Sequence, residues 1–171
     1  MRNLLMGLVL FVVLPASGYA QDAAWKEYVH SENLMAFSMP GDPAYSTQSL
    51  KTKLGKIIIH SYILENKSGA LMVMVNVYPD AVLKTPAQKL LAAGRDGAVG
   101  NIHGKVVSQK VISVDGNPGI EFVFVSKDWH GVYRIYLVGT RLYQLGALAA
   151  IAAPDFPGTE QFLNSFRLVK E

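Results

Sequence analysis

The feature that most constrains the fold is a pair of apolar segments, residues 57–64 and 70–78, which flank the turn sequence Asn66-Lys67-Ser68-Gly69. This pattern predicts a β-hairpin with a four-residue turn. Both segments carry apolar side chains at odd and at even positions, so each strand has two apolar faces. Such strands lie inside a sheet that is covered on both sides. We therefore expect further layers above and below this hairpin.

One helix has a strong predicted start. Thr85 is placed as the N-cap, Pro86 as the first helical residue, and Gln88 three positions after the cap would close a capping box. Apolar or small side chains then follow at helical spacing, at Ala87, Leu90, Leu91, Gly94 and Ala98. The spacing predicts an amphipathic helix that lies on the sheet.

The remaining segments read mostly as strands joined by short turns. Alternating or apolar runs predict strands at 35–39, 45–50, 105–114, 119–126, 131–138, 141–149 and 166–169, and a short helix at 155–164. Short connections favour antiparallel pairing. The fold class is therefore predicted as α+β, an antiparallel β-sheet with helices packed on both faces, that is, an α/β/α sandwich.

Residues 1–20 are predicted to be a secretory signal peptide. They combine a positive charge at Arg2, an apolar run over 4–14 and small residues at positions 18 and 20. The apolar run is too short to span a bilayer as a helix, which takes about 20 residues. We expect cleavage, one domain over residues 21–171, and a periplasmic or secreted protein without a permanent membrane anchor.

Composition limits how this domain is stabilised and what it binds. The chain has no cysteine, so disulfides, thiolate metal ligands and a cysteine-linked lipid are excluded. Its formal net charge of +3 is spread without clusters, which predicts no nucleic-acid partner. The domain has to fold by packing alone, and we expect no cofactor.

The order of these motifs resembles the PsbP-like domains, a family that includes an extrinsic photosystem II subunit and many secreted bacterial proteins. The matching segments are Trp25 and Tyr28, Phe37-Ser38-Met39-Pro40-Gly41-Asp42-Pro43, the helix over 90–97, Gly116-Asn117-Pro118-Gly119, the hairpin over 134–145, and Phe162-Leu163-Asn164-Ser165-Phe166. The resemblance covers nearly all of residues 21–171. It implies an antiparallel sheet sandwiched by helices and a protein that binds partners rather than catalysing a reaction.

No residue pattern predicts a catalytic centre or a metal site. The four histidines, His30, His60, His103 and His130, form no H-x-H or H-E-x-x-H pair from which a zinc site could be built. The chain also lacks G-x-S-x-G and cysteine, the usual signs of nucleophilic catalysis. We therefore predict no catalytic residue and no metal ligand.

The strongest candidate binding constellation lies in the hairpin around Gly139-Thr140. If Val138 faces Arg141 across this two-residue turn, then Arg134, Tyr136, Arg141 and Tyr143 share one face. Two guanidinium groups beside two rings could hold an anionic or aromatic ligand. The alternative is structural: the tyrosines support a helix, and the arginines pair with carboxylates such as Asp96 or Glu160.

A second candidate is the predicted loop tip over residues 127–131. Trp129 stands there beside His130, and tryptophan is unusual in a fully solvated turn. Trp129 could anchor a protein contact, because tryptophan is enriched at interface hot spots. Alternatively, its ring folds back over the sheet.

Three functions are compatible with the sequence. The first is an extracytoplasmic, non-enzymatic binding or assembly protein that contacts another extracytoplasmic protein through its loop tips. The second is a carrier of a small apolar or amphipathic ligand in a cleft between helix and sheet, suggested by the adaptable side chains of Met35, Met39, Met72 and Met74. The third and least favoured is a hydrolase whose site is not visible in the sequence.

Overall fold

The structure is a computed structural model and describes residues 24–52 and 55–170. The predicted signal peptide, residues 1–20, lies outside the described residues. Within the described part of the chain, no helix is both long and apolar enough to cross a bilayer.

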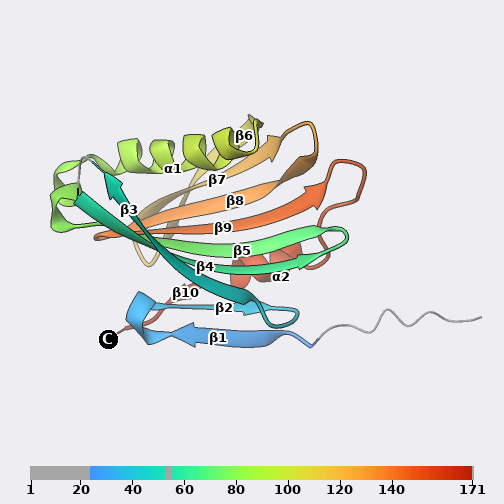
Figure 1. Ribbon diagram of the computed structural model, residues 1–171, viewed down its shortest axis with the longest axis horizontal. Helices are drawn as coiled ribbons and strands as arrows, with labels where there is room; N and C mark the ends of the chain where they lie inside the picture. Colours follow the sequence, from blue (N-terminus) through green and yellow to red (C-terminus); the bar gives the residue numbers. More distant parts are fainter. Residues whose placement is uncertain (1–23, 53–54, 171) are drawn as a thin grey trace, which may run out of the picture.

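A seven-stranded antiparallel sheet forms the centre of the molecule (Figure 1). Its strands, in spatial order, are β3 (Ala44–Thr52), β4 (Gly55–Asn66), β5 (Gly69–Val77), β9 (Arg141–Ala150), β8 (Trp129–Val138), β7 (Asn117–Val125) and β6 (Lys105–Val114). The predicted apolar hairpin is β4 and β5, and both strands are interior, as their two apolar faces require.

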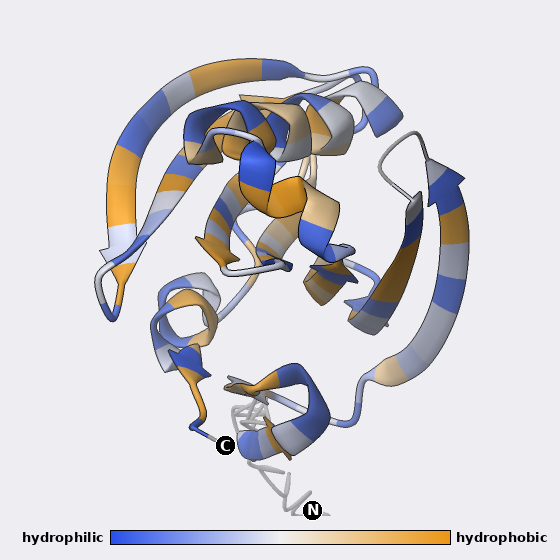
Figure 2. Cartoon of the chain, turned by 90° about the vertical axis from the view of Figure 1, so that its left-hand side faces the viewer, coloured by the Kyte–Doolittle hydropathy of each residue, from blue (hydrophilic) through white to orange (hydrophobic). Residues whose placement is uncertain are grey.

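The two faces of this sheet have different covers. Helix α1 (Ala87–Asn101) lies on one face, and the sheet curls around it (Figure 2). The other face carries the short helix α2 (Thr159–Ser165) and a three-stranded sheet in the order β1 (Lys26–His30), β2 (Met35–Met39), β10 (Arg167–Leu168). The predicted α/β/α sandwich is thus correct for the face under α1 and needs correction on the other, which a second sheet largely covers.

The second sheet was not predicted because its strand β1 shows no period-2 pattern of apolar residues. The strand reads Lys26-Glu27-Tyr28-Val29-His30 and shows no apolar alternation, because its one aliphatic side chain, Val29, is exposed while Tyr28 and His30 point into the protein. It pairs with all of β2, from Lys26 opposite Met39 to His30 opposite Met35. A short 3-10 helix, η1 (Ser31–Asn33), joins the two strands.

Two turns follow the prediction closely, and a third differs. Val138 pairs with Arg141 across the predicted two-residue turn, and Gly139 has φ +55° while Thr140 keeps negative φ, which suits a type II′ turn. In the β4–β5 hairpin, the Asn66 side-chain Oδ1 accepts hydrogen bonds from the N–H groups of Ser68 and Gly69, at 2.7 and 3.1 Å. The predicted break over 115–118 is shorter, because Asp115 and Gly116 alone turn at positive φ and β7 already begins at Asn117.

The predicted N-cap is wrong by one position, and the predicted capping box does not form. Pro86 is the N-cap of α1, and no side chain caps the helix. Thr85 instead ends the preceding 3-10 helix η2 (Asp80–Lys84), where its N–H donates to the carbonyl of Val82 at 2.8 Å. The carbonyl of Pro86 accepts the first helical hydrogen bond, from the N–H of Lys89 at 3.0 Å.

Candidate functional site

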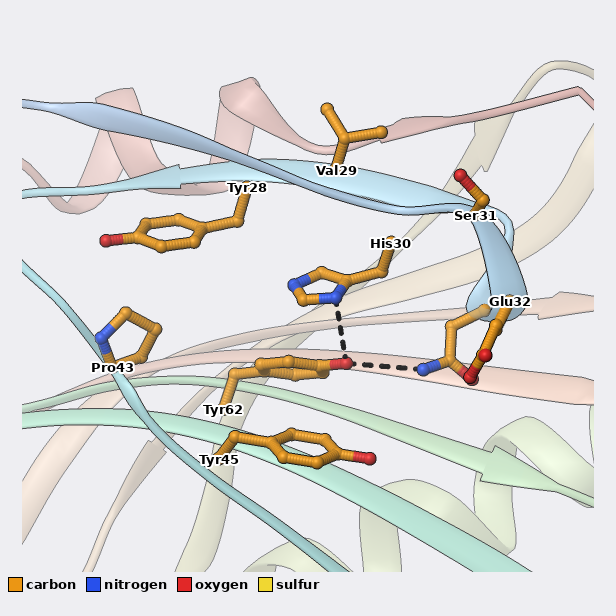
Figure 3. Close-up of a pocket in the computed structure, with 9 residues that line it drawn as sticks. Tyr28, Val29, His30, Ser31, Glu32, Pro43, Tyr45 and Tyr62 are labelled. Carbon is orange, nitrogen blue, oxygen red and sulfur yellow. Dashed lines mark hydrogen bonds between the residues drawn. The ribbon is translucent and has the colours of Figure 1, made fainter.

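A pocket of about 510 Å³ lies where the small sheet meets the β3–β4 edge of the large sheet. We call it the aromatic pocket. Its lining residues are Tyr28, Val29, His30, Ser31, Glu32, Asn33, Pro43, Tyr45 and Tyr62. Figure 3 shows β1 and η1 on one side of it and Pro43, Tyr45 and Tyr62 on the other.

Strand alternation and register bring the rings together. Tyr28 and His30 project from the same side of β1, while Val29 between them is exposed. Tyr45 of β3 lies opposite Tyr62 of β4, with their ring centroids 4.9 Å apart. The His30 ring lies 4.2 Å from the ring of Tyr62, so three rings from three strands are in contact.

A chain of hydrogen bonds connects Asn33, Tyr62 and His30 and leaves one ring nitrogen of His30 without a partner among the described residues (Figure 3). The Asn33 side-chain amide donates to the hydroxyl oxygen of Tyr62 at 3.3 Å, and that hydroxyl lies 3.2 Å from His30 Nδ1. The tyrosine proton is then available for Nδ1, which puts the ring proton of a neutral His30 on Nε2. Nε2 is buried and has no partner among the described residues.

The electrostatics of the pocket favour this neutral imidazole. Burial, and secondarily the charge of His60, lowers the pKa of His30 below its ordinary value. Burial likewise raises the pKa of Tyr62, so its hydroxyl keeps its proton. The hydroxyl oxygen of Tyr28 lies 2.7 Å from two acceptors, the carbonyl oxygen of Gly41 and the carboxylate of Asp42, which share its one proton. These groups give the pocket aromatic walls with fixed polar atoms.

A second hollow, of about 370 Å³, lies between α1 and the β3, β4, β5 and β9 side of the large sheet. We call it the helix–sheet cleft. Of the four methionines that suggested such a cleft, only Met74 lines it. Met35 and Met39 are fully buried in the small sheet, and Met72 accepts a hydrogen bond from the hydroxyl of Tyr133 at 2.9 Å.

The structure brings Arg134, Tyr136, Arg141 and Tyr143 to one face, as the register predicts. That face lies against α2 and the small sheet, so Tyr143 is fully buried and Tyr136 is 6% exposed. The ring of Tyr136 stacks on Phe166 at 5.5 Å, and the hydroxyl of Tyr143 donates to the carbonyl of Asn33 at 2.8 Å. For the two tyrosines these contacts are those of the structural alternative, whereas Arg141 Nε is buried and has no hydrogen-bond partner among the described residues.

Arg134 is the centre of a polar cluster at the edge of that face. Its guanidinium group donates to Glu121 at 2.7 Å and to the carbonyl of Leu163 at 3.0 Å, and it lies 4.0 Å from Glu160, the predicted partner. Burial would raise the pKa of Glu121, but hydrogen bonds from Lys110 and Arg134 outweigh it and hold this pKa below its usual value. Asp96, the other predicted partner, pairs with Arg95.

Trp129 and His130 begin β8 rather than form a free loop tip. The ring nitrogen Nε2 of His130 lies 2.9 Å from the carbonyl of Ala153, and Nδ1 lies 3.5 Å from Asp155. Trp129 is 37% exposed, so part of its ring is accessible from solvent.

Sequence spacing gives no sign of the aromatic pocket. Tyr28 and His30 lie in a strand that periodicity does not predict, and Tyr62 is more than thirty positions further along the chain. The one available signal is that Tyr45 and Tyr62 lie in consecutive predicted strands, 45–50 and 57–64. Among the described residues, no group of three or more histidine, aspartate or glutamate side chains could hold a metal ion.

No protein-family model and no curated protein sequence matches the chain. A solved structure does: the solution structure of cyanobacterial PsbP from Synechocystis sp. PCC 6803 superposes with a TM-score of 0.54 at 11% identity. The match covers 91% of this chain and 98% of that one. At this identity the likeness concerns the fold, and the predicted PsbP-like fold is confirmed.

Proposed function

We propose that this chain is an extracytoplasmic, non-enzymatic binding protein that holds another extracytoplasmic protein at its aromatic pocket. The observation that carries the proposal is the buried, unpartnered Nε2 of His30 at a hollow walled by tyrosine rings. A buried donor without a partner costs about 1–3 kcal/mol, and an acceptor on a bound partner would remove that cost.

The walls of the pocket suit a protein partner. Tyr45 is 55% exposed and presents an apolar ring with a polar tip, the kind of side chain that is enriched at interfaces. A carbonyl of the partner would accept from His30 Nε2 while an apolar or aromatic side chain packs on Tyr45 and Pro43. The PsbP-like fold and the predicted signal peptide support an extracytoplasmic binding role.

The test is capture of a partner from the periplasmic or secreted fraction with mild cross-linking. We expect Tyr45→Ala to lower the recovery of the partner by about tenfold, a loss of about 1.4 kcal/mol of binding. Val111→Ala is the control, because Val111 is 84% exposed on the far edge strand β6 and should leave recovery unchanged. Recovery of no partner, or equal recovery with both variants, contradicts the proposal.

The start of β8 is a second proposed contact. Trp129 keeps an accessible ring, and its substitution by alanine in the same capture experiment measures its share of the interface. If Trp129→Ala abolishes capture and Tyr45→Ala does not, the partner binds at β8 and the aromatic pocket is not the interface.

The helix–sheet cleft favours a second candidate function, a carrier of a small amphipathic ligand. Its volume of about 370 Å³ falls within the range of small-molecule sites. Native mass spectrometry of protein purified without detergent tests this function. A constant mass excess that organic solvent removes is expected for a carrier, and a protein that is always empty contradicts it.

A further inference from the structure

The floor of the helix–sheet cleft carries amide side chains in a defined arrangement. Cross-strand pairing places Gln48 opposite Ile59 and Ile59 opposite Asn76, so these residues form one row across β3, β4 and β5. In β9, Gln144 pairs with Met74 of β5. All five line the cleft, on the face of the sheet that α1 covers.

The roof of the cleft consists of small residues of α1. Ala93, Gly94, Gly97 and Ala98 all line it. A Cβ atom added at Gly97 would meet nothing within 4 Å, so the space below this turn is not filled by the protein. Helix α1 is buried instead through Leu90, Leu91 and Val99, whose core cluster includes residues of β7, β8 and β9.

One of the amides lacks the partner that buried amides normally have. Asn76 Oδ1 is buried and has no hydrogen-bond partner among the described residues. Gln144, which also lines the cleft, is only 5% exposed. The cleft therefore offers an amide acceptor at Asn76 and an amide group with both donor and acceptor atoms at Gln144.

None of the described residues that line the cleft carries a charge. A charged ligand would lose its hydration there without gaining a counter-charge, which is unfavourable. A neutral head group with an N–H or O–H donor would satisfy Asn76 Oδ1 instead. Leu50, Ile59 and Met74 provide the apolar surface for an attached chain.

From these observations, and resting on the carrier function above, we propose that the helix–sheet cleft binds an uncharged amphipathic molecule with an amide- or alcohol-type head group. The head group hydrogen-bonds to Asn76 and Gln144, and the chain lies along Ile59 and Met74 below Gly97.

The experiment titrates the purified protein, without residues 1–20, with three probes of similar length: N-hexylacetamide, hexylammonium and heptanoate. NMR shifts of the side-chain amides of Asn76 and Gln144 report binding. We expect N-hexylacetamide to bind at least about tenfold more tightly than either charged probe.

Two variants on α1 locate the binding. Gly97→Leu fills the cleft and should abolish the shifts. Gly100→Leu is the matched control, because Gly100 is also open to added atoms but does not line the cleft, so binding should persist. Asn76→Leu removes the acceptor without changing the helix and should weaken N-hexylacetamide by about tenfold.

The outcomes distinguish a failure of the carrier function from a failure of the proposed ligand class. If no probe binds and native mass spectrometry finds the protein empty, the carrier function fails, and this inference fails with it. If the charged probes bind as tightly as N-hexylacetamide, the carrier function survives and the neutral ligand class is overturned. Binding that Gly97→Leu leaves intact overturns the assignment to this cleft.

Discussion

Replacing Arg134 by methionine tests whether the face shared by β8 and β9 is structural. Methionine keeps an unbranched apolar stem and removes only the guanidinium group. That group belongs to a side chain that is 15% exposed, and it donates to Glu121 at 2.7 Å, to the carbonyl of Leu163 at 3.0 Å and to Asn164 at 2.8 Å. The substitution therefore cuts the polar link between the large sheet and the end of α2.

The expected loss of stability is about 2 kcal/mol. Removing one partner of a fully buried ion pair costs about 3–5 kcal/mol, because the other charge is left buried and unpaired. Here Glu121 keeps the ammonium group of Lys110 at 2.7 Å, which reduces that penalty. The lost hydrogen bonds to Leu163 and Asn164 still contribute, at about 0.5–1.5 kcal/mol each for neutral pairs and more for charged ones.

Urea unfolding followed by circular dichroism measures this loss as a shift in midpoint at constant slope. Lys110→Met is the control, because the Lys110 side chain is 65% exposed and such surface pairs contribute about 0.2–1 kcal/mol. The difference between wild type and Arg134→Met should shrink at low pH. The pKa of Glu121 is lowered by folding, so the pair stabilises the fold above the usual glutamate pKa and ceases to do so as the pH falls through the lowered value.

An Arg134→Met variant that is as stable as wild type, or less affected than Lys110→Met, would refute the structural interpretation. The guanidinium group would then be free for the ligand role that the hairpin pattern also suggests. A loss near 2 kcal/mol with unchanged slope supports it.

Three further outcomes are expected. Tyr143→Phe should lower stability by about 1–3 kcal/mol, because it leaves the carbonyl of Asn33 without its buried donor; an unchanged urea midpoint contradicts this. Gly97→Ala should stabilise α1 by about 1 kcal/mol, whereas Gly94→Ala should gain less because its Cβ would lie 3.0 Å from a leucine of β9; thermal melts that rank them in the opposite order contradict the packing. Folding lowers the pKa of His30, so wild-type stability should fall as the pH drops from about 6.5 toward that lowered value, and His30→Phe should flatten the dependence; equal slopes of melting temperature against pH would disprove it.

The sequence predicts those parts of the fold that local chemistry decides. Gly139 in the turn sets the pairing of Val138 with Arg141, and the two-faced apolar pattern of 57–64 and 70–78 places β4 and β5 inside the sheet. Thr85 shows the limit of local signals. Its capping pattern is sound, but η2 uses its backbone N–H first, and the helix then begins after Pro86.

The candidate sites depend on long-range contacts that no local pattern encodes. His30 and Tyr62 meet because the small sheet packs on the β3–β4 edge of the large sheet, and β1 has no periodicity from which to predict it. Arg134 shows the converse: register predicted its face, and the structural alternative predicted its place near Glu160 of the short helix. The helix–sheet cleft was predicted from methionines, and the structure builds it mainly from amides and small helical residues.

The small sheet ties together the two ends of the described chain. Ala36 of β2 pairs with Arg167, and the N–H of Val169 donates to the carbonyl of Leu34 at 3.0 Å. This layer is therefore completed only when residues 167–169 have been synthesised and have left the ribosome. A truncated product that stops before residue 167 would keep the strands of the large sheet but lose β10. Strand β2 would then lack one of its two neighbours, which weakens the small sheet whose strand β1 carries His30.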